Sequence, residues 1–159
     1  MHREIRENRA TESAHTIMSC LFCGIVNGEI NASIVFEDDL SIAFLDHRPL
    51  FHGHCLLVPR HHFETLIDLP AEFIGPLFEN AQLLARAVET AMDAEGSFVA
   101  MNNRVSQSVP HLHIHVVPRR RKDGLKGFFW PRTKYSNPEQ MFAVRELIQL
   151  AVARIRNSF

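Results

Sequence analysis

Seven residues in the second half of the chain, 111–117, read His-Leu-His-Ile-His-Val-Val. Strict alternation of this kind predicts a β-strand, whose successive side chains point to opposite faces. The three histidines therefore share one face, and Leu112, Ile114 and Val116 point into the core. Neighbouring imidazoles would lie ~6.6 Å apart along the strand, so one phosphate fits against the row. Burying such a row is costly unless it binds something, which indicates a functional site, with a structural metal site as the alternative.

Apolar runs elsewhere predict the rest of the fold. Four more strands are expected at Ile34–Glu37, Ser41–Asp46, His54–Val58 and Phe98–Met101, and Pro59 and Pro118 are expected to stop the third strand and the histidine strand. One amphipathic helix of about six turns is predicted between Pro70 and Gly96, and a second from Glu139 onward, with Asn137 as its N-cap. This order favours an α+β domain with a mainly antiparallel sheet.

Composition narrows the class of protein. The chain has 159 residues, 46% of them hydrophobic, and a formal net charge of −1. It is long enough for one core and too apolar to be disordered. It has no apolar run of ~18 residues that could cross a membrane, and its charge argues against coating nucleic acid. Residues 1–17 lack the apolar stretch of a secretory signal, which favours a cytoplasmic protein. We expect these residues to be a flexible tail, and Met18 is the alternative start of translation. A single domain is expected over residues 18–159.

Three cysteines do not make a disulfide framework. Cys55 lies in a predicted strand and is interpreted as a small buried hydrophobe. Cys20 and Cys23 form a C-x-x-C pair, which by itself is compatible with either a redox or a metal-binding role.

The histidine strand resembles the motif of the histidine-triad (HIT) family, in which three histidines alternate with apolar residues. The similarity continues in the family's order over roughly residues 20–118, through the segments Cys20–Glu29, Val35–Asp39, Ala43–Asp46, Gly53–His62 and Gln107–Val109. It points to the zinc-containing, bacterial-type branch. The resemblance implies a five-stranded HIT-like sheet with one long central helix and a C-terminal helix, the sheet being extended across a homodimer.

The resemblance also implies a reaction. His113 matches the nucleophile that attacks the α-phosphorus of a nucleoside phosphate ester, anhydride or phosphoramidate, and water then releases the monophosphate from a nucleotidyl-histidine. His115 would donate a hydrogen bond to a phosphoryl oxygen or the leaving group, and Gln107 and Ser108 match the loop that contacts these oxygens. The family usually has glycine where this chain has Ser106, and the side chain of serine restricts the backbone there.

Nucleoside binding is implied at a further set of positions. An apolar pocket for the base would be formed by Phe22, Ile25, Phe44 and Leu45. Asp46 matches the acid that accepts hydrogen bonds from the ribose hydroxyls, a role that suits a carboxylate. Either Asn102 or Asn103 takes the position of the family's asparagine.

Two thiols and two imidazoles suit tetrahedral zinc, and the resemblance brings Cys20, Cys23, His62 and His111 together as such a site. His61 is the alternative to His62. Because four protein ligands leave no open position for water, the zinc would be structural.

Residues 119–134 form a basic stretch that contains Arg119, Arg120, Arg121, Lys122, Lys126, Arg132 and Lys134. It is either a solvated loop or an attractor for a polyphosphate or, less expected, a nucleic-acid end. Trp130 would lie near the partner's active site in a family dimer.

The function expected from the sequence is therefore a nucleotidyl hydrolase. The alternatives are a nucleotide-binding interaction protein with negligible turnover and a nucleotidyl transferase. His115 disfavours the transferase, because the related uridylyltransferases carry glutamine at that position.

Overall fold

A computed structural model describes residues 20–125, 135–140, 142–145 and 149. Residues 1–123 and 124–159 form two separate units. The predicted tail, Met18 and Trp130, together with Lys126, Arg132 and Lys134, lie outside the described residues. No helix among the described residues is long and apolar enough to cross a membrane.

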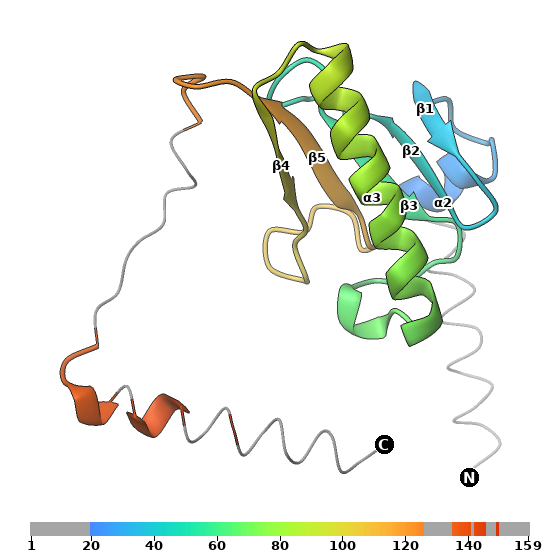
Figure 1. Ribbon diagram of the computed structural model, residues 1–159. Coiled ribbons are helices and arrows are strands. Elements are labelled where there is room, and N and C mark those ends of the chain that lie inside the picture. The colour runs from blue at the N-terminus through green and yellow to red at the C-terminus, as the bar shows by residue number, and fades with distance from the viewer. Residues whose placement is uncertain (1–19, 126–134, 141, 146–148, 150–159) are drawn as a thin grey trace, which may run out of the picture. The chain divides into compact units, whose positions relative to one another are not determined.

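The first unit contains one antiparallel five-stranded sheet (Figure 1). Its strands are β1 (Ile34–Glu37), β2 (Ser41–Leu45), β3 (Cys55–Pro59), β4 (Gly96–Ala100) and β5 (Ile114–Arg119), in the order β1-β2-β3-β5-β4. The helices are α2 (Leu21–Val26) and α3 (Ala71–Ala91), and a 3₁₀ turn, η1, spans Leu66–Asp68. The expected α+β fold, with one long helix and an antiparallel sheet, is confirmed.

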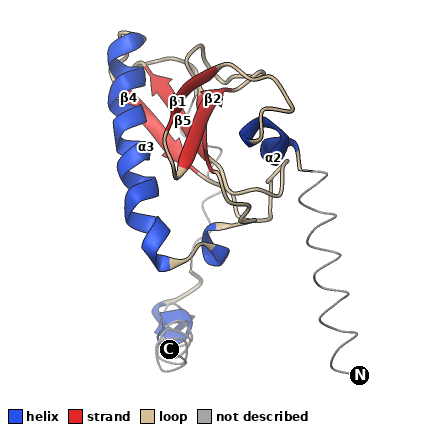
Figure 2. Ribbon diagram, turned by 90° about the vertical axis from the view of Figure 1, so that its right-hand side faces the viewer, coloured by secondary structure: helices blue, strands red, loops and turns tan. Residues whose placement is uncertain are grey.

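The sheet lies between α3 and α2 (Figure 2), and each face has its own core. Alternate residues of β2 and β3 divide between the two: Ala43 and Leu57 belong to the α3 side, and Phe44 and Leu56 to the α2 side. Leu112, Ile114 and Val116 all join the α3-side core, as the alternating pattern predicts. His115 pairs with Leu56 in the β3–β5 ladder, so it faces the α2 side.

The predicted limits of four strands were wrong: β2 ends at Leu45 rather than at 46, β3 spans Cys55–Pro59 rather than 54–58, β4 spans Gly96–Ala100 rather than 98–101, and β5 spans Ile114–Arg119 rather than 111–117. Strand β5 begins at Ile114 rather than at His111. The amide of His111 donates to Val109 O and the amide of Leu112 donates to Phe63 O, so neither amide pairs with a neighbouring strand. Pro118 does not stop β5; it pairs with Ser97. Pairing of β5 with β3 ends at Val116, so beyond that point the missing N–H of proline is not needed on the β3 side.

Pro59 likewise belongs to β3, where it pairs with Ser41 beyond the last residue that β3 shares with β5. In the second unit, residues 138–140 and 142–145 are helical. The side chain of Asn137 accepts a hydrogen bond from the amide of Gln140 at 2.8 Å, which confirms the predicted N-cap.

Candidate functional site

The imidazole of His113 is held by the backbone two residues before it. Its Nδ1 lies 2.7 Å from the carbonyl oxygen of His111. A carbonyl can only accept a hydrogen bond, so Nδ1 carries a proton, and in the neutral ring the lone pair is on Nε2. The residue is 3% exposed and packed against Phe22. The ring is therefore oriented in the tautomer that a nucleophile attacking through Nε2 requires.

His115 has the opposite tautomer, and a fourth histidine determines it. The amide of Leu50 donates to Nδ1 of His54 at 3.1 Å, so the proton of a neutral His54 is on Nε2. That Nε2 lies 2.9 Å from Nδ1 of His115 and donates to it. The proton of His115 is then on Nε2, where it can be donated to a ligand.

Burial keeps both of these rings neutral. Burial, together with the neighbouring His113 and His54, lowers the pKa of His115 to about 4, against the opposing effect of Asp46. Burial also lowers the pKa of His54, against the opposing effect of Asp46. At neutral pH, His115 is thus an uncharged hydrogen-bond donor.

His54 was not among the site residues predicted from the sequence. It directly precedes β3, and alternation with Leu56 places it on the α2 side, so the strand register was the signal that could have found it. Asp46, the predicted ribose ligand, is close by: its Oδ2 lies 3.6 Å from His54 Nδ1, and its Oδ1 accepts a hydrogen bond from the amide of Arg48.

A second cluster brings together all four predicted metal ligands. The ligand atoms of Cys20, Cys23, His62 and His111 lie within 4.8 Å of one another. His111 Nδ1 is 3.5 Å from Cys20 Sγ and 3.6 Å from Cys23 Sγ, and His62 Nδ1 is 3.3 Å from Cys23 Sγ. His62, and not His61, is the histidine of this cluster.

These residues fit zinc. A tetrahedral ion with Zn–S of ~2.3 Å and Zn–N of ~2.0 Å holds sulfur and nitrogen about 3.5 Å apart, close to the separations above. His111 donates its Nε2 proton to the carbonyl of Pro59 at 2.9 Å, which leaves Nδ1 free to bind a metal. Burial, assisted by Cys20, raises the pKa of the Cys23 thiol to about 12, so a bound cation would compensate a thiolate that is otherwise unfavourable.

The side-chain amide of Gln107, in the loop before the triad, is hydrogen-bonded at both of its ends. Its Oε1 accepts from the amide of Arg104 at 2.7 Å, and its Nε2 donates to Glu64 O at 2.6 Å. Asn103 Oδ1 accepts from the amide of Leu66, whereas Asn102 donates only within the loop, to Ser106 O. Ser108 is exposed.

Ser106 has φ of 60°, in the left-handed region that favours glycine. The loop therefore keeps the backbone conformation that glycine would adopt more easily, although serine stands in its place.

The predicted base-pocket residues differ in exposure. Phe22, Ile25 and Phe44 are buried in the α2-side core at 5%, 9% and 3%, whereas Leu45 is 41% exposed. Cys55 is buried, as expected, and its Sγ donates to Gly53 O.

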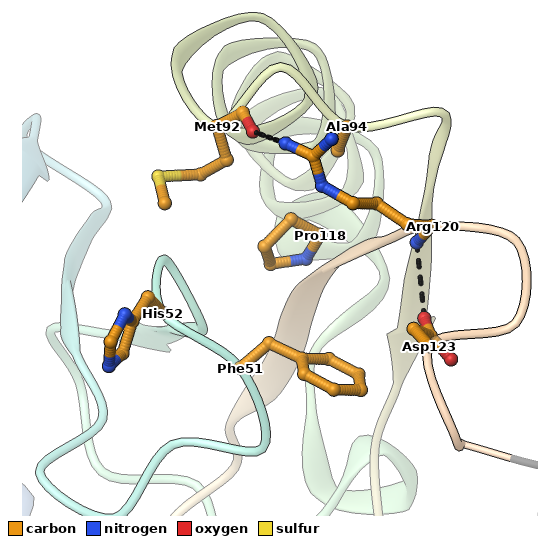
Figure 3. A pocket seen from close by; sticks show the side chains of 7 residues that line it. All are labelled: Phe51, His52, Met92, Ala94, Pro118, Arg120 and Asp123. Carbon is orange, nitrogen blue, oxygen red and sulfur yellow. Dashed lines mark hydrogen bonds between the residues drawn. The ribbon is translucent and has the colours of Figure 1, made fainter.

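A separate cavity of about 210 Å³ lies beside the end of α3 (Figure 3). None of the triad histidines lines it; its walls include Phe51, Met92 and Pro118. Arg120 at its rim donates to the carbonyl of Met92 at 2.7 Å, and Arg121 pairs with Glu95. These two arginines of the basic stretch thus have partners within the unit.

Comparison with known proteins agrees with this geometry. The family model described as the HIT domain matches residues 27–122. An adenosine 5′-monophosphoramidase of Schizosaccharomyces pombe is 35% identical over 133 residues, which cover 82% of this chain and 96% of that protein. An adenylylsulfatase of Arabidopsis thaliana is 33% identical over 116 residues, covering 72% of this chain but only 59% of the plant protein.

A crystal structure of a zinc-bound histidine-triad protein from Mycobacterium smegmatis superposes with a TM-score of 0.65 at 34% identity, over 90% of this chain and 99% of that one. Its bound zinc and the Cys/His cluster described above support the zinc-containing branch. With the family model matching more than half of its length and the triad in place just before and at the start of β5, the chain belongs to the HIT family.

Proposed function

We propose that the protein hydrolyses a nucleoside 5′-monophosphate derivative at its α-phosphorus through a covalent intermediate on His113. The observation that carries this proposal is the 2.7 Å hydrogen bond from His113 Nδ1 to the carbonyl of His111, since it places the lone pair of the neutral ring on Nε2. Both compared enzymes, the phosphoramidase and the adenylylsulfatase, are named for substrates in which AMP is joined to a leaving group.

In the first step, the Nε2 lone pair forms an N–P bond while the bond from phosphorus to the leaving group breaks, and the leaving group takes that electron pair. The Nε2 proton of His115 is donated in a hydrogen bond to a phosphoryl or leaving-group oxygen, where negative charge grows. In the second step, water attacks phosphorus while the N–P bond breaks and its electron pair returns to Nε2 of His113; the proton that water loses passes to the released leaving group or to solvent, and the nucleoside monophosphate is released.

Three further roles belong to this proposal. Asp46 accepts hydrogen bonds from the ribose, and Ser108 contacts the phosphate. The base is contacted by the apolar pocket formed by Phe22, Ile25, Phe44 and Leu45. Gln107 acts mainly by holding the loop, because both ends of its amide are already bonded within the protein. Zinc, when bound, supplies a structural cross-link between α2 and the residues before β5; Cys20, Cys23, His62 and His111 would hold it.

The protein is also proposed to be a homodimer through β4. Among the described residues this strand lies at an edge of the sheet, the position at which a strand from a second copy of the chain can extend the sheet. Val99 on β4 is 43% exposed and Phe78 on α3 is 41% exposed. Glu89 of α3 accepts a hydrogen bond from Ser97 of β4, so this face of α3 lies beside β4. Phe78 is three helical turns before Glu89 and therefore lies on the same face of α3. The side chains of Phe78 and Val99 are thus beside the same edge of the sheet. Val99→Lys should yield monomers in sedimentation velocity.

The test is a substrate panel that contains adenosine 5′-phosphosulfate, adenosine 5′-phosphoramidate, dinucleoside polyphosphates and the guanosine equivalents. We expect monophosphate release and, on rapid acid quench, a protein carrying one nucleotidyl group by intact mass. Both should vanish in His113→Ala and persist in His61→Ala, which alters an exposed histidine outside the clusters. Nucleotide binding with equal, negligible release by the wild type and His113→Ala would instead identify a binding protein.

A further inference from the structure

The order of the strands gives a bound substrate a direction across the sheet. Asp46, the proposed ribose ligand, directly follows β2, and His115 is on β5, two strands further along the sheet. The strand beyond β5 is β4. The nucleoside and the leaving group are separate substituents on the α-phosphorus. With the sugar at Asp46 and the phosphorus at the triad, the leaving group is therefore directed away from β2 and towards β4.

The loop formed by residues 101–110 lies on that side and connects β4 to the triad (Figure 1). It begins directly after Ala100, which pairs with His115, and it ends at His111, so both of its ends are beside the triad. Arg104 is exposed on this loop, and its guanidinium makes no hydrogen bond or ion pair with another described residue. The leaving-group side of the site thus carries an unpartnered positive charge.

The backbone of Arg104 is held in a conformation that a side chain disfavours. Its φ is 68°, in the left-handed region. Its amide donates to Gln107 Oε1 at 2.7 Å, and Gln107 Nε2 donates to Glu64 O, which ties the loop to the segment after β3. Strained residues that are held in this way are concentrated at functional sites. Because the backbone is already fixed, less conformational entropy is lost when the guanidinium binds a ligand.

The hydrogen-bond donor at the triad has no positive charge of its own. His115 and His54 are neutral at neutral pH, because burial lowers the pKa of each ring, and the side chain beside them is the acidic Asp46. A sulfate or phosphate leaving group gains negative charge as its bond to phosphorus breaks. A guanidinium stabilises such a group better than a neutral donor does, since it can donate to two of its oxygens at once.

We infer that Arg104 binds the anionic end of the leaving group, so that the site favours substrates whose leaving group is a sulfate or a phosphate over those whose leaving group is uncharged. For the reaction, this inference rests on the proposed function. The preference in binding does not, because it can be measured without turnover.

The kinetic test compares adenosine 5′-phosphosulfate with adenosine 5′-phosphoramidate, which differ only in the leaving group. Arg104→Gln removes the charge, Arg104→Lys keeps it, and the control Arg86→Gln removes an exposed arginine from α3, on the opposite face of the sheet from the triad. We expect Arg104→Gln to lower kcat/KM by about tenfold for the phosphosulfate and by less than about twofold for the phosphoramidate. Arg104→Lys should recover part of the loss, and Arg86→Gln should change neither value.

Binding provides the second readout. Calorimetry on the zinc-loaded protein compares AMP with adenosine 5′-(α,β-methylene)diphosphate, whose second phosphate stands in the position of the leaving group. The wild type and Arg86→Gln should bind the diphosphate more tightly than AMP, and Arg104→Gln should lose most of this preference.

Equal affinity of the wild type for the two nucleotides, or a preference that survives in Arg104→Gln, would overturn the inference. An unchanged ratio of kcat/KM between the two substrates in Arg104→Gln would overturn it as well. If the wild type turns over neither substrate but shows the expected preference in binding, the proposed function fails and the role of Arg104 stands.

Discussion

The depressed pKa of His115 predicts how stability changes with pH. In the unfolded chain this ring takes up a proton near pH 6.5, whereas in the folded protein it does so only near 4. Between these values the unfolded state binds more protons, so acidification favours unfolding. The contribution of His115 to folding is complete above pH 6.5 and is lost progressively as the pH falls towards 4.

The magnitude follows from the two pKa values. At pH 5 the unfolded ring is almost fully charged and the folded ring almost fully neutral, which corresponds to a loss of about 2 kcal/mol. Because His115 keeps some contact with solvent, which stabilises the charged form, we discount this to between about 1 and 2 kcal/mol.

The assay measures urea unfolding of the wild type and His115→Gln at pH 7 and pH 5, with equal zinc. Glutamine does not titrate, and the pH dependence of zinc binding acts on both proteins and cancels in the comparison. The advantage of the wild type in free energy of unfolding should shrink by about 1 to 2 kcal/mol on acidification. A change below about 0.5 kcal/mol, or one of opposite sign, would refute the claim that burial keeps this ring neutral.

Three other tests concern the hydrogen bonds, the metal and the backbone. His54→Ala removes one hydrogen bond from His115 and should lower kcat by up to about tenfold, whereas His115→Ala removes the donor itself and should cost about a hundredfold or more in steady-state assays; equal losses would contradict this ranking. Cys23→Ser should lower the zinc content measured by atomic emission and reduce the melting temperature, while His61→Ala leaves both unchanged. Ser106→Gly should stabilise the fold by about 0.5 to 1 kcal/mol in thermal melts, because glycine relieves the left-handed backbone; destabilisation would argue against that conformation.

The fold was largely predictable because its signals are local. The alternation of Leu112, Ile114 and Val116 with the histidines was enough to assign a strand and its buried face. The start of that strand was not predictable, since the amides of His111 and Leu112 bond to Val109 and Phe63, and no periodicity reports such contacts. The short helix α2 was missed for a related reason: six residues show no usable helical period.

The site was predictable only where a motif or a resemblance covered it. The spacing of Cys20, Cys23, His62 and His111 is too wide to indicate a cluster by itself, yet the structure brings the four together. The register of β3 could place His54 on the α2 side, but a single histidine beside a strand is usually an ordinary buried residue, so its role did not follow from the sequence. The two hydrogen bonds of the Gln107 amide also depend on the conformation of a loop, which its sequence does not encode in a simple pattern.

His113 and His115 differ in chemistry, although both are histidines at neighbouring positions on the same face. Their rings are 5.0 Å apart, yet one exposes a lone pair and the other a proton. The difference originates in the backbone: a carbonyl at His111 accepts from His113, and an amide at Leu50 begins the hydrogen-bond chain that reaches His115 through His54. A carbonyl and an amide cannot exchange roles, so the assignment of acceptor and donor is fixed by the fold itself. Substitutions that shift the loop at Leu50 should therefore impair the donor without touching any side chain of the triad.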